Sequence, residues 1–189
     1  ATKTTFDFSN GAKAEYVDPA DLVYSHTESP YFDDVYYVGE VKELPINELV
    51  KQFPQLSEEE IKDLVDKYAY PIDYVANRDK NKVNVLYFNY KTHMNDVYKL
   101  KKVGSGAEKI IEKDDTFNPP AESMDGNFEK LERVVEVLYE GVYIIGADKI
   151  LTWKMCDNMM RTDSDFSRVK MNYQIVAPRL YEGRIESLV

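Results

Sequence analysis

The sequence Leu138-Tyr-Glu-Gly-Val-Tyr-Ile-Ile-Gly-Ala-Asp-Lys-Ile-Leu151 decides the fold class of this chain. It contains an apolar segment, a turn at residues 146–149 and the start of a second apolar segment, which extends over 150–155; together these form the pattern of a β-hairpin. The spacing over 131–145 fits a helix as well as a strand. Because β-branched and aromatic side chains dominate there, we expect helix or loop up to about residue 132 and strand beyond it.

Similar patterns predict strands along most of the chain. They are expected at 12–17, 22–24, 35–43, 83–94, 97–103 and 169–176. The strands at 83–94 and 97–103 are expected to pair as a second hairpin. The polar residues 1–11 are expected to be loosely ordered, and 70–82 to form a linker.

Two short helices are predicted between residues 45 and 68. Pro45 suits a helix start, the apolar residues after it follow helical spacing, and Pro54 ends this first helix. Ser57 and Glu60 form the pattern of a capping box at the start of the second helix. The glutamates at 58–60 lie in its first turn, where the helix dipole favours negative charge, so they need no metal ion to explain them.

These elements predict an α+β fold built mainly of antiparallel β-hairpins, with two short helices near residues 45–68. The 189 residues suffice for one ordinary domain, 1–189, that buries a core. A long surface loop is expected over 104–127, with one or two helical turns at 107–113. A further loop is expected over 158–168.

The composition excludes several classes of protein. A net charge of −10 argues against a sequence-independent grip on nucleic-acid phosphates. The single cysteine, Cys156, excludes an internal disulfide framework, and its apolar neighbours predict a core thiol in a reducing compartment. No apolar run approaches 18 residues, so no membrane-spanning segment is expected. The 15 tyrosines favour half-buried sheet faces and also suit contacts between subunits.

The chemistry-bearing residues form no recognisable catalytic motif. His26 and His93 have no Cys, His or Glu at ligand spacing, and residues 104–109 lack the Gly-Lys-Ser/Thr of a phosphate loop. The acidic pairs 33–34 and 114–115 are typical of solvated loops, although they could bind a divalent cation weakly. We therefore expect no catalytic, cofactor-binding or metal-binding residues. One alternative stays open, a small metal-dependent hydrolase that uses the pair 33–34.

An ordered series of motifs resembles one protein family. The first three motifs give a turn, a strand and a short helix in an order similar to the wing region of tailed-bacteriophage portal proteins: Asp18-Pro-Ala-Asp-Leu-Val-Tyr24, Tyr37-Val-Gly-Glu-Val-Lys42 and Glu48-Leu-Val-Lys-Gln-Phe-Pro54. The later motifs are similar to portals of crAss-like phages: Asn89-Tyr-Lys-Thr92, Val97-Tyr-Lys99, Asp114-Asp-Thr-Phe-Asn-Pro-Pro120, Glu136-Val-Leu-Tyr-Glu-Gly-Val142, Ala177-Pro-Arg179 and Tyr181-Glu-Gly-Arg-Ile-Glu-Ser-Leu-Val189. The resemblance extends from about residue 17 to the end of the chain.

The resemblance implies a structural virion protein without enzymatic activity. Portals of this family form dodecameric rings at one capsid vertex, through which DNA is packaged and ejected. The implied partners are other copies of the chain, the capsid protein, terminase and tail adaptor proteins, with double-stranded DNA passing transiently and non-specifically. The implied location is the virion, after assembly in the host bacterial cytoplasm. Another head-tail connector or adaptor protein stays open as an alternative.

The C-terminal segment predicts a contact element. A helix is expected to start at Tyr181, with Ile185 and Leu188 on its apolar stripe. Family portals are several times longer, so we expect this chain to be a wing-region piece of a longer protein. Because a nine-residue helix is marginal alone, we expect Tyr181, Arg184, Ile185 and Leu188 to contact another segment or subunit.

Overall fold

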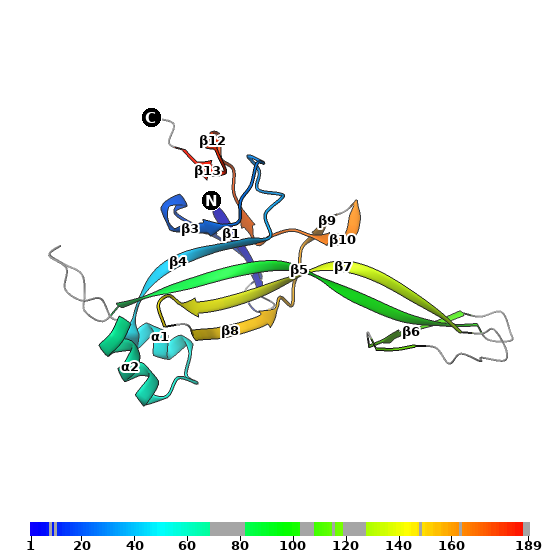
Figure 1. Ribbon diagram of the computed structural model, residues 1–189, viewed down its shortest axis with the longest axis horizontal. Helices are drawn as coiled ribbons and strands as arrows, with labels where there is room; N and C mark the ends of the chain where they lie inside the picture. Colours follow the sequence, from blue (N-terminus) through cyan, green and yellow to red (C-terminus); the bar gives the residue numbers. More distant parts are fainter. Residues whose placement is uncertain are drawn as a thin grey trace.

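The computed structural model describes residues 1–7, 9, 11–68, 82–102, 108–114, 116–118, 128–147, 149–162 and 164–186 (Figure 1). The linker predicted over 70–82 lies outside these residues, apart from Lys82, which begins a strand.

The framework of the molecule is an antiparallel sheet, which together with two short helices gives an α+β fold. Its strands are β3 (Leu22–Tyr24), β4 (Tyr37–Pro45), β5 (Lys82–Lys102), β7 (Phe128–Ile144) and β8 (Lys149–Met155), in the order β3-β4-β5-β7-β8. The predicted hairpin around the turn at 146–149 is confirmed, because β7 and β8 pair in antiparallel register from Tyr139 opposite Met155 to Ile144 opposite Lys149.

The helices begin and end where the local signals predict. After the 3-10 turn η1 (Pro19–Asp21) come α1 (Ile46–Gln52) and α2 (Glu58–Tyr68). The capping box is formed in both directions, since the Glu60 amide donates to Ser57 Oγ at 3.3 Å and the Ser57 amide donates to Glu60 Oε2 at 3.0 Å. Among the described residues, no helix is both long enough and apolar enough to span a bilayer.

Strand β5 is continuous over 21 residues, so the predicted hairpin of 83–94 with 97–103 is wrong. Asn95 and Asp96 have turn-like side chains, but they pair with Val134 and Arg133 of β7 without a break in register. Strand β7 likewise starts at Phe128, so the helix or loop expected up to residue 132 is wrong as well. Uninterrupted cross-strand hydrogen bonding outweighs the local turn preference here.

The far halves of β5 and β7 form a projecting arm, defined by residues 91–102, 108–113 and 128–137. Figure 1 shows it extending away from the body, on the side opposite the helices. Strand β6 (Glu108–Lys113) adds a third strand by pairing with residues 97–102 of β5. The helical turns expected at 107–113 are therefore wrong, because the β-branched Ile110 and Ile111 pair across the sheet with Leu100 and Lys99. The rest of the predicted 104–127 loop lies largely outside the described residues.

Small antiparallel sheets surround the body. Strands β1 (Thr2–Asp7), β2 (Gly11–Tyr16) and β11 (Tyr173–Gln174) form one in the order β11-β1-β2, so the loose order expected for residues 1–11 is wrong. Lys3 binds the buried carboxylate of Glu40 at 3.0 Å, which ties β1 to the central sheet. Strands β9 (Arg161–Thr162) and β10 (Asp165–Val169) occupy the predicted 158–168 loop, and the final strand expected over 169–176 is reduced to β11.

Near the end of the described residues, β12 (Leu180–Tyr181) and β13 (Arg184–Ile185) form a hairpin, so the helix predicted from Tyr181 is wrong. The two residues between the strands, Glu182 and Gly183, have φ angles of 47° and 76°. Positive φ at both central positions is the geometry of a type I′ turn, which connects two strands tightly.

Two hydrophobic cores lie against the central sheet. Core 1 packs Val38 and Leu138 of the sheet against side chains from the surrounding segments, chiefly Val17, Phe32, Val35, Cys156, Val169, Met171, Tyr173, Ile175 and Ala177. Core 2 packs Leu49, Phe53, Leu56 and Leu64 of the helical region against Val83, Val85 and Ile144.

Candidate functional site

The predicted contact residues differ in exposure, since Ile185 is partly buried and the other described ones are exposed. Ile185 packs against core 1, and its amide donates to Tyr24 Oη at 3.2 Å. Tyr181 is 61% exposed and Arg184 is also exposed, whereas Leu188 lies outside the described residues. The hairpin thus anchors itself through Ile185 on its own chain and leaves Tyr181 and Arg184 available to a partner.

The C-terminal hairpin lies on the loop that joins β3 to β4. The Ala177 amide donates to the Pro30 carbonyl at 3.0 Å. A Cβ atom added at Gly183 would lie 2.6 Å from His26 Nδ1, so glycine permits this close approach. His26 therefore borders a packing contact, and the Glu28 carboxylate lies 4.0 Å from its Nε2.

A cavity of about 410 Å³ lies between this loop and the segment that runs from β10 into β11. Three cationic side chains, Lys91, Arg168 and Lys170, line it together with one acidic side chain, Asp33. We call it the basic cavity. Its volume falls in the range typical of ligand pockets, which combine apolar walls with a few polar groups.

A strained turn at Phe32 places the ring of Tyr31 at the rim of the basic cavity. Phe32 has a φ angle of 57° although it is not glycine, and its buried ring meets Tyr24 edge to face at 5.1 Å. The turn is closed by hydrogen bonds from the amides of Phe32 and Tyr31 to Ser29. With Phe32 fixed in the core, the neighbouring Tyr31 is held 70% exposed.

In the acidic pair 33–34, on which the hydrolase alternative depends, Asp34 has a structural role. Its carboxylate accepts hydrogen bonds from the Thr27 hydroxyl and from the Glu28 amide. Burial alone would raise the pKa of Asp34, but these hydrogen bonds together lower it below its ordinary value. Within the described ranges, no three His, Cys, Asp or Glu side chains gather as metal ligands, and Asp115 of the second acidic pair lies outside them.

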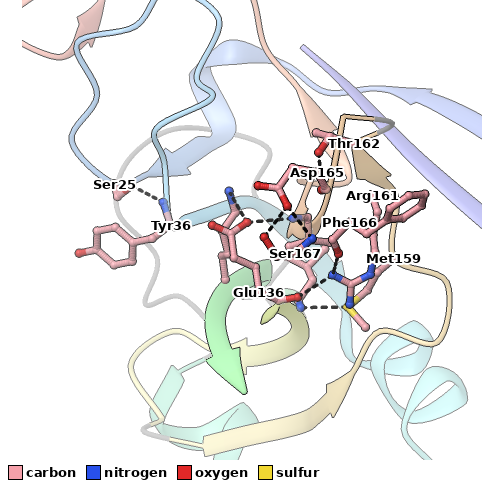
Figure 2. A network of polar contacts seen from close by, with 12 residues as sticks. Ser25, Tyr36, Glu136, Met159, Arg161, Thr162, Asp165, Phe166 and Ser167 are labelled. Carbon is pink, nitrogen blue, oxygen red and sulfur yellow. Dashed lines mark hydrogen bonds and ion pairs between the residues drawn. The ribbon is translucent and has the colours of Figure 1, made fainter. Parts of the chain in front are cut away.

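Figure 2 shows how the wall of the basic cavity is attached to the central sheet. Arg161 Nη1 donates to the carbonyl oxygens of Glu136 at 3.1 Å and Phe166 at 2.9 Å. The Glu136 carboxylate accepts from the Val169 amide at 2.8 Å and lies 3.9 Å from Lys91 Nζ. Glu136 on β7 therefore fixes β10, which carries Arg168 at its end, and also faces the deepest cation of the cavity.

Arg168 and Lys170 are the cations that remain available. Both are exposed, and neither forms an ion pair within 4.0 Å in the part of the chain that the structure describes. Their alternation along the chain is a sequence signal that could have marked them as a basic pair on one side of an extended segment. Sequence reasoning assigned no role to either residue.

A second candidate surface is aromatic. The rings of Phe88 and Tyr90 on β5 and of Tyr139 on β7 surround Trp153 on β8, at centroid distances of 5.8, 6.1 and 5.2 Å. Tyr36 extends the group toward β4, since its ring meets that of Tyr90 edge to face. Trp153 is 48% exposed, so this aromatic face is open to solvent at its centre. The abundance of tyrosine predicted such a face, but the chain segments that build it could not be read from sequence.

The single thiol belongs to the packing rather than to a reaction centre. Cys156 is buried in core 1, and the Asn89 amide group lies 3.8 Å from its sulfur. Burial, and secondarily the nearby Glu140, raises the pKa of Cys156 to about 11. The predicted core thiol is therefore confirmed.

Comparison of the chain with protein-family models and with curated proteins finds no match.

Proposed function

We propose that this chain is a structural segment of a phage portal, the ring at a capsid vertex through which DNA is packaged and ejected. The ordered motif series from residue 17 to the C-terminus supports the family, and the geometry supports a protein that works through contacts with other copies. The virion is its proposed location, after assembly in the host cytoplasm.

The arm is the observation that carries this proposal. Strand β5 rises about 3.3 Å per residue, so its 21 residues span roughly 70 Å, about half of which lies in the arm. The register places Ile110 and Leu131 on one face of the arm, where they are 64% and 41% exposed. A long ribbon with exposed apolar side chains is costly for a protein that acts alone, but suits one that reaches a neighbour.

A ring of identical subunits needs two different surfaces that complement each other. The arm supplies one surface distant from the body, and the aromatic face around Trp153 supplies another apolar surface on the body itself. The net charge of −10 suits a ring through which DNA moves transiently, since a negative surface does not retain phosphates. Capsid protein, terminase and tail adaptors are the proposed partners.

The test is assembly of the full natural chain that carries this sequence, followed by mass photometry and negative-stain electron microscopy. We expect closed rings. The double substitution Ile110→Asp with Leu131→Asp should reduce ring formation, because it places charges on the apolar face of the arm. Tyr16→Asp with Ala14→Asp, at two exposed positions of β2, adds the same two charges and is the matched control, which should leave the rings intact.

Wild-type protein that stays monomeric at all concentrations would contradict the ring. Rings that form equally well from the arm variant would show that other surfaces carry the contact. A head-tail adaptor is the alternative function, and capture of terminase by the purified rings would distinguish a portal from it.

A further inference from the structure

The described residues that line the basic cavity carry more positive than negative charge, although Lys91 already lies 3.9 Å from the Glu136 carboxylate. Arg168 and Lys170 stand at its edge without ion-pair partners among the described residues, and Lys91 lies deeper, 14% exposed. Among the described residues that line it, Asp33 is the one with an acidic side chain. Arginine and lysine together favour carboxylate or phosphate groups, through charge-assisted hydrogen bonds. In a chain of net charge −10, such a positive cavity needs an explanation.

The same chain carries a concentrated source of carboxylates at its helical end. Residues 43–66 contain seven acidic and two basic side chains, a net charge of −5, which is half the net charge of the whole chain. Glu60 is used internally, because it pairs with Lys149 and with Ser57. Glu58 and Glu59 are exposed in the first turn of α2, and no described residue binds their side chains.

We propose that the acidic first turn of α2 in one copy docks at the mouth of the basic cavity in the next copy. Glu58 and Glu59 would there meet Arg168 and Lys170, with Tyr31 covering the contact from the rim. The inference rests on the proposed ring and names the surfaces that would join its subunits.

The placement of the two surfaces fits a head-to-tail contact. In Figure 1, α2 lies at one end of the body, at the lower left, whereas β10 lies toward its other end, above β7. Two different patches on separate parts of one molecule make a heterologous contact, and such contacts close into rings when the rotation allows it. Complementary charge also orients the approaching copy and disfavours the reversed pairing.

Two charge reversals test this contact in the full natural chain. The first variant combines Arg168→Glu with Lys170→Glu, and the second combines Glu58→Lys with Glu59→Lys. Each variant alone presents like charges at every contact, so we expect the concentration for half-assembly to rise at least tenfold. In a 1:1 mixture each acidic turn meets a basic cavity and each reversed turn meets a reversed cavity. Assembly should then return to within about threefold of wild type.

The mixture separates a lost contact from a damaged fold, because a misfolded variant would not be rescued by its counterpart. The matched control, Lys13→Glu with Ala12→Glu and Ala14→Glu, lowers the net charge as much as the cavity variant does, at exposed positions of β2, and should assemble like wild type. If both variants still form rings as wild type does, or if a mixture of variants that keep the wild-type circular dichroism spectrum fails to assemble, this contact is overturned while the ring itself stands. If only the cavity variant loses assembly and inorganic phosphate inhibits the wild type, the cavity takes an anion from elsewhere and the proposal is wrong. Absence of wild-type assembly would instead contradict the ring itself.

Discussion

At the scale of single residues, Gly39 and Gly141 shape the aromatic face by leaving room for Phe88. A Cβ atom at Gly141 would lie 2.4 Å from Phe88 Cζ. At Gly39 it would lie 2.7 Å from both Phe88 Cβ and the Tyr87 carbonyl oxygen. The ring of Phe88 thus covers Gly141 on the neighbouring strand β7, as aromatic side chains do where a strand lacks a side chain of its own, whereas Gly39 on β4 lies against the start of the Phe88 side chain and the backbone of β5.

The two glycines should respond differently to alanine. Gly39→Ala should lower the free energy of unfolding by about 1–3 kcal/mol, because backbone and Cβ atoms cannot move aside. Gly141→Ala should cost less, because the far edge of a ring can rotate away. Removing the ring with Phe88→Ala should relieve the Gly141→Ala clash but not the Gly39→Ala clash, as measured by urea unfolding of single and double variants. Equal costs at the two glycines would contradict this account.

Cys156 should be nearly inert in the folded chain. At pH 8 a thiol of pKa about 11 has roughly a hundredfold less thiolate than one of pKa 9, and burial slows access further. Alkylation by iodoacetamide should therefore be more than 100-fold slower in the folded than in the urea-unfolded chain. Because the pKa of Cys156 is raised in the folded state, the thiol contributes fully to the free energy of unfolding below about pH 9, and this contribution is lost as the pH rises through about 11. Equal alkylation rates in the two states would show that the thiol is exposed.

At the scale of elements, the β9–β10 pair depends on one strand that is distant in sequence. Its hydrogen bonds to β7 use both the backbone carbonyl and the side chain of Glu136. Since the Val169 amide belongs to a buried residue, the carboxylate is its necessary acceptor.

Glu136→Ala should loosen this wall of the basic cavity. The unsatisfied Val169 amide should cost about 1–3 kcal/mol, and hydrogen exchange should accelerate at Val169 and its neighbours in β10. Glu136→Gln keeps an acceptor oxygen and should restore most of the protection. The control Glu132→Ala removes an exposed partner of Lys130 from the same strand and should have little effect. If hydrogen exchange in β10 is unchanged in Glu136→Ala, the attachment of β10 to β7 does not depend on the Glu136 side chain.

At the scale of the whole molecule, strand β7 joins the two cores. Leu138 belongs to core 1 and Ile144 to core 2, six positions along the same strand. Both cores also use neighbouring strands of one hydrogen-bonded sheet. We therefore expect the two cores to unfold together in a single transition.

Leu49→Ala tests this coupling. Leu49 is fully buried in core 2, and its truncation should cost about 2–5 kcal/mol. If unfolding is cooperative, alkylation of Cys156 in core 1 should accelerate by the matching factor. Trp153 fluorescence and far-ultraviolet circular dichroism should also report the same midpoint. A variant that loses stability without any change at Cys156 would mean that the cores unfold separately.

Sequence alone determined the elements whose causes are local. Pro45 and Pro54 delimit α1, Ser57 with Glu60 caps α2, and the turn at 146–149 joins β7 to β8. Each of these signals acts through a backbone or side-chain group within a few residues of the structure that it specifies, so a linear reading finds it.

Only the tertiary structure decided the elements that depend on distant partners. Asn95 and Asp96 would favour a turn by themselves, but β7, almost forty residues later, keeps them in a continuous strand. The C-terminal hairpin needs Tyr24 and His26 beneath it, and the basic cavity joins side chains from the β3–β4 loop, β5 and β10. Cross-strand pairing and burial reward contacts between segments far apart in the chain, and local preference carries no information about which segments will meet.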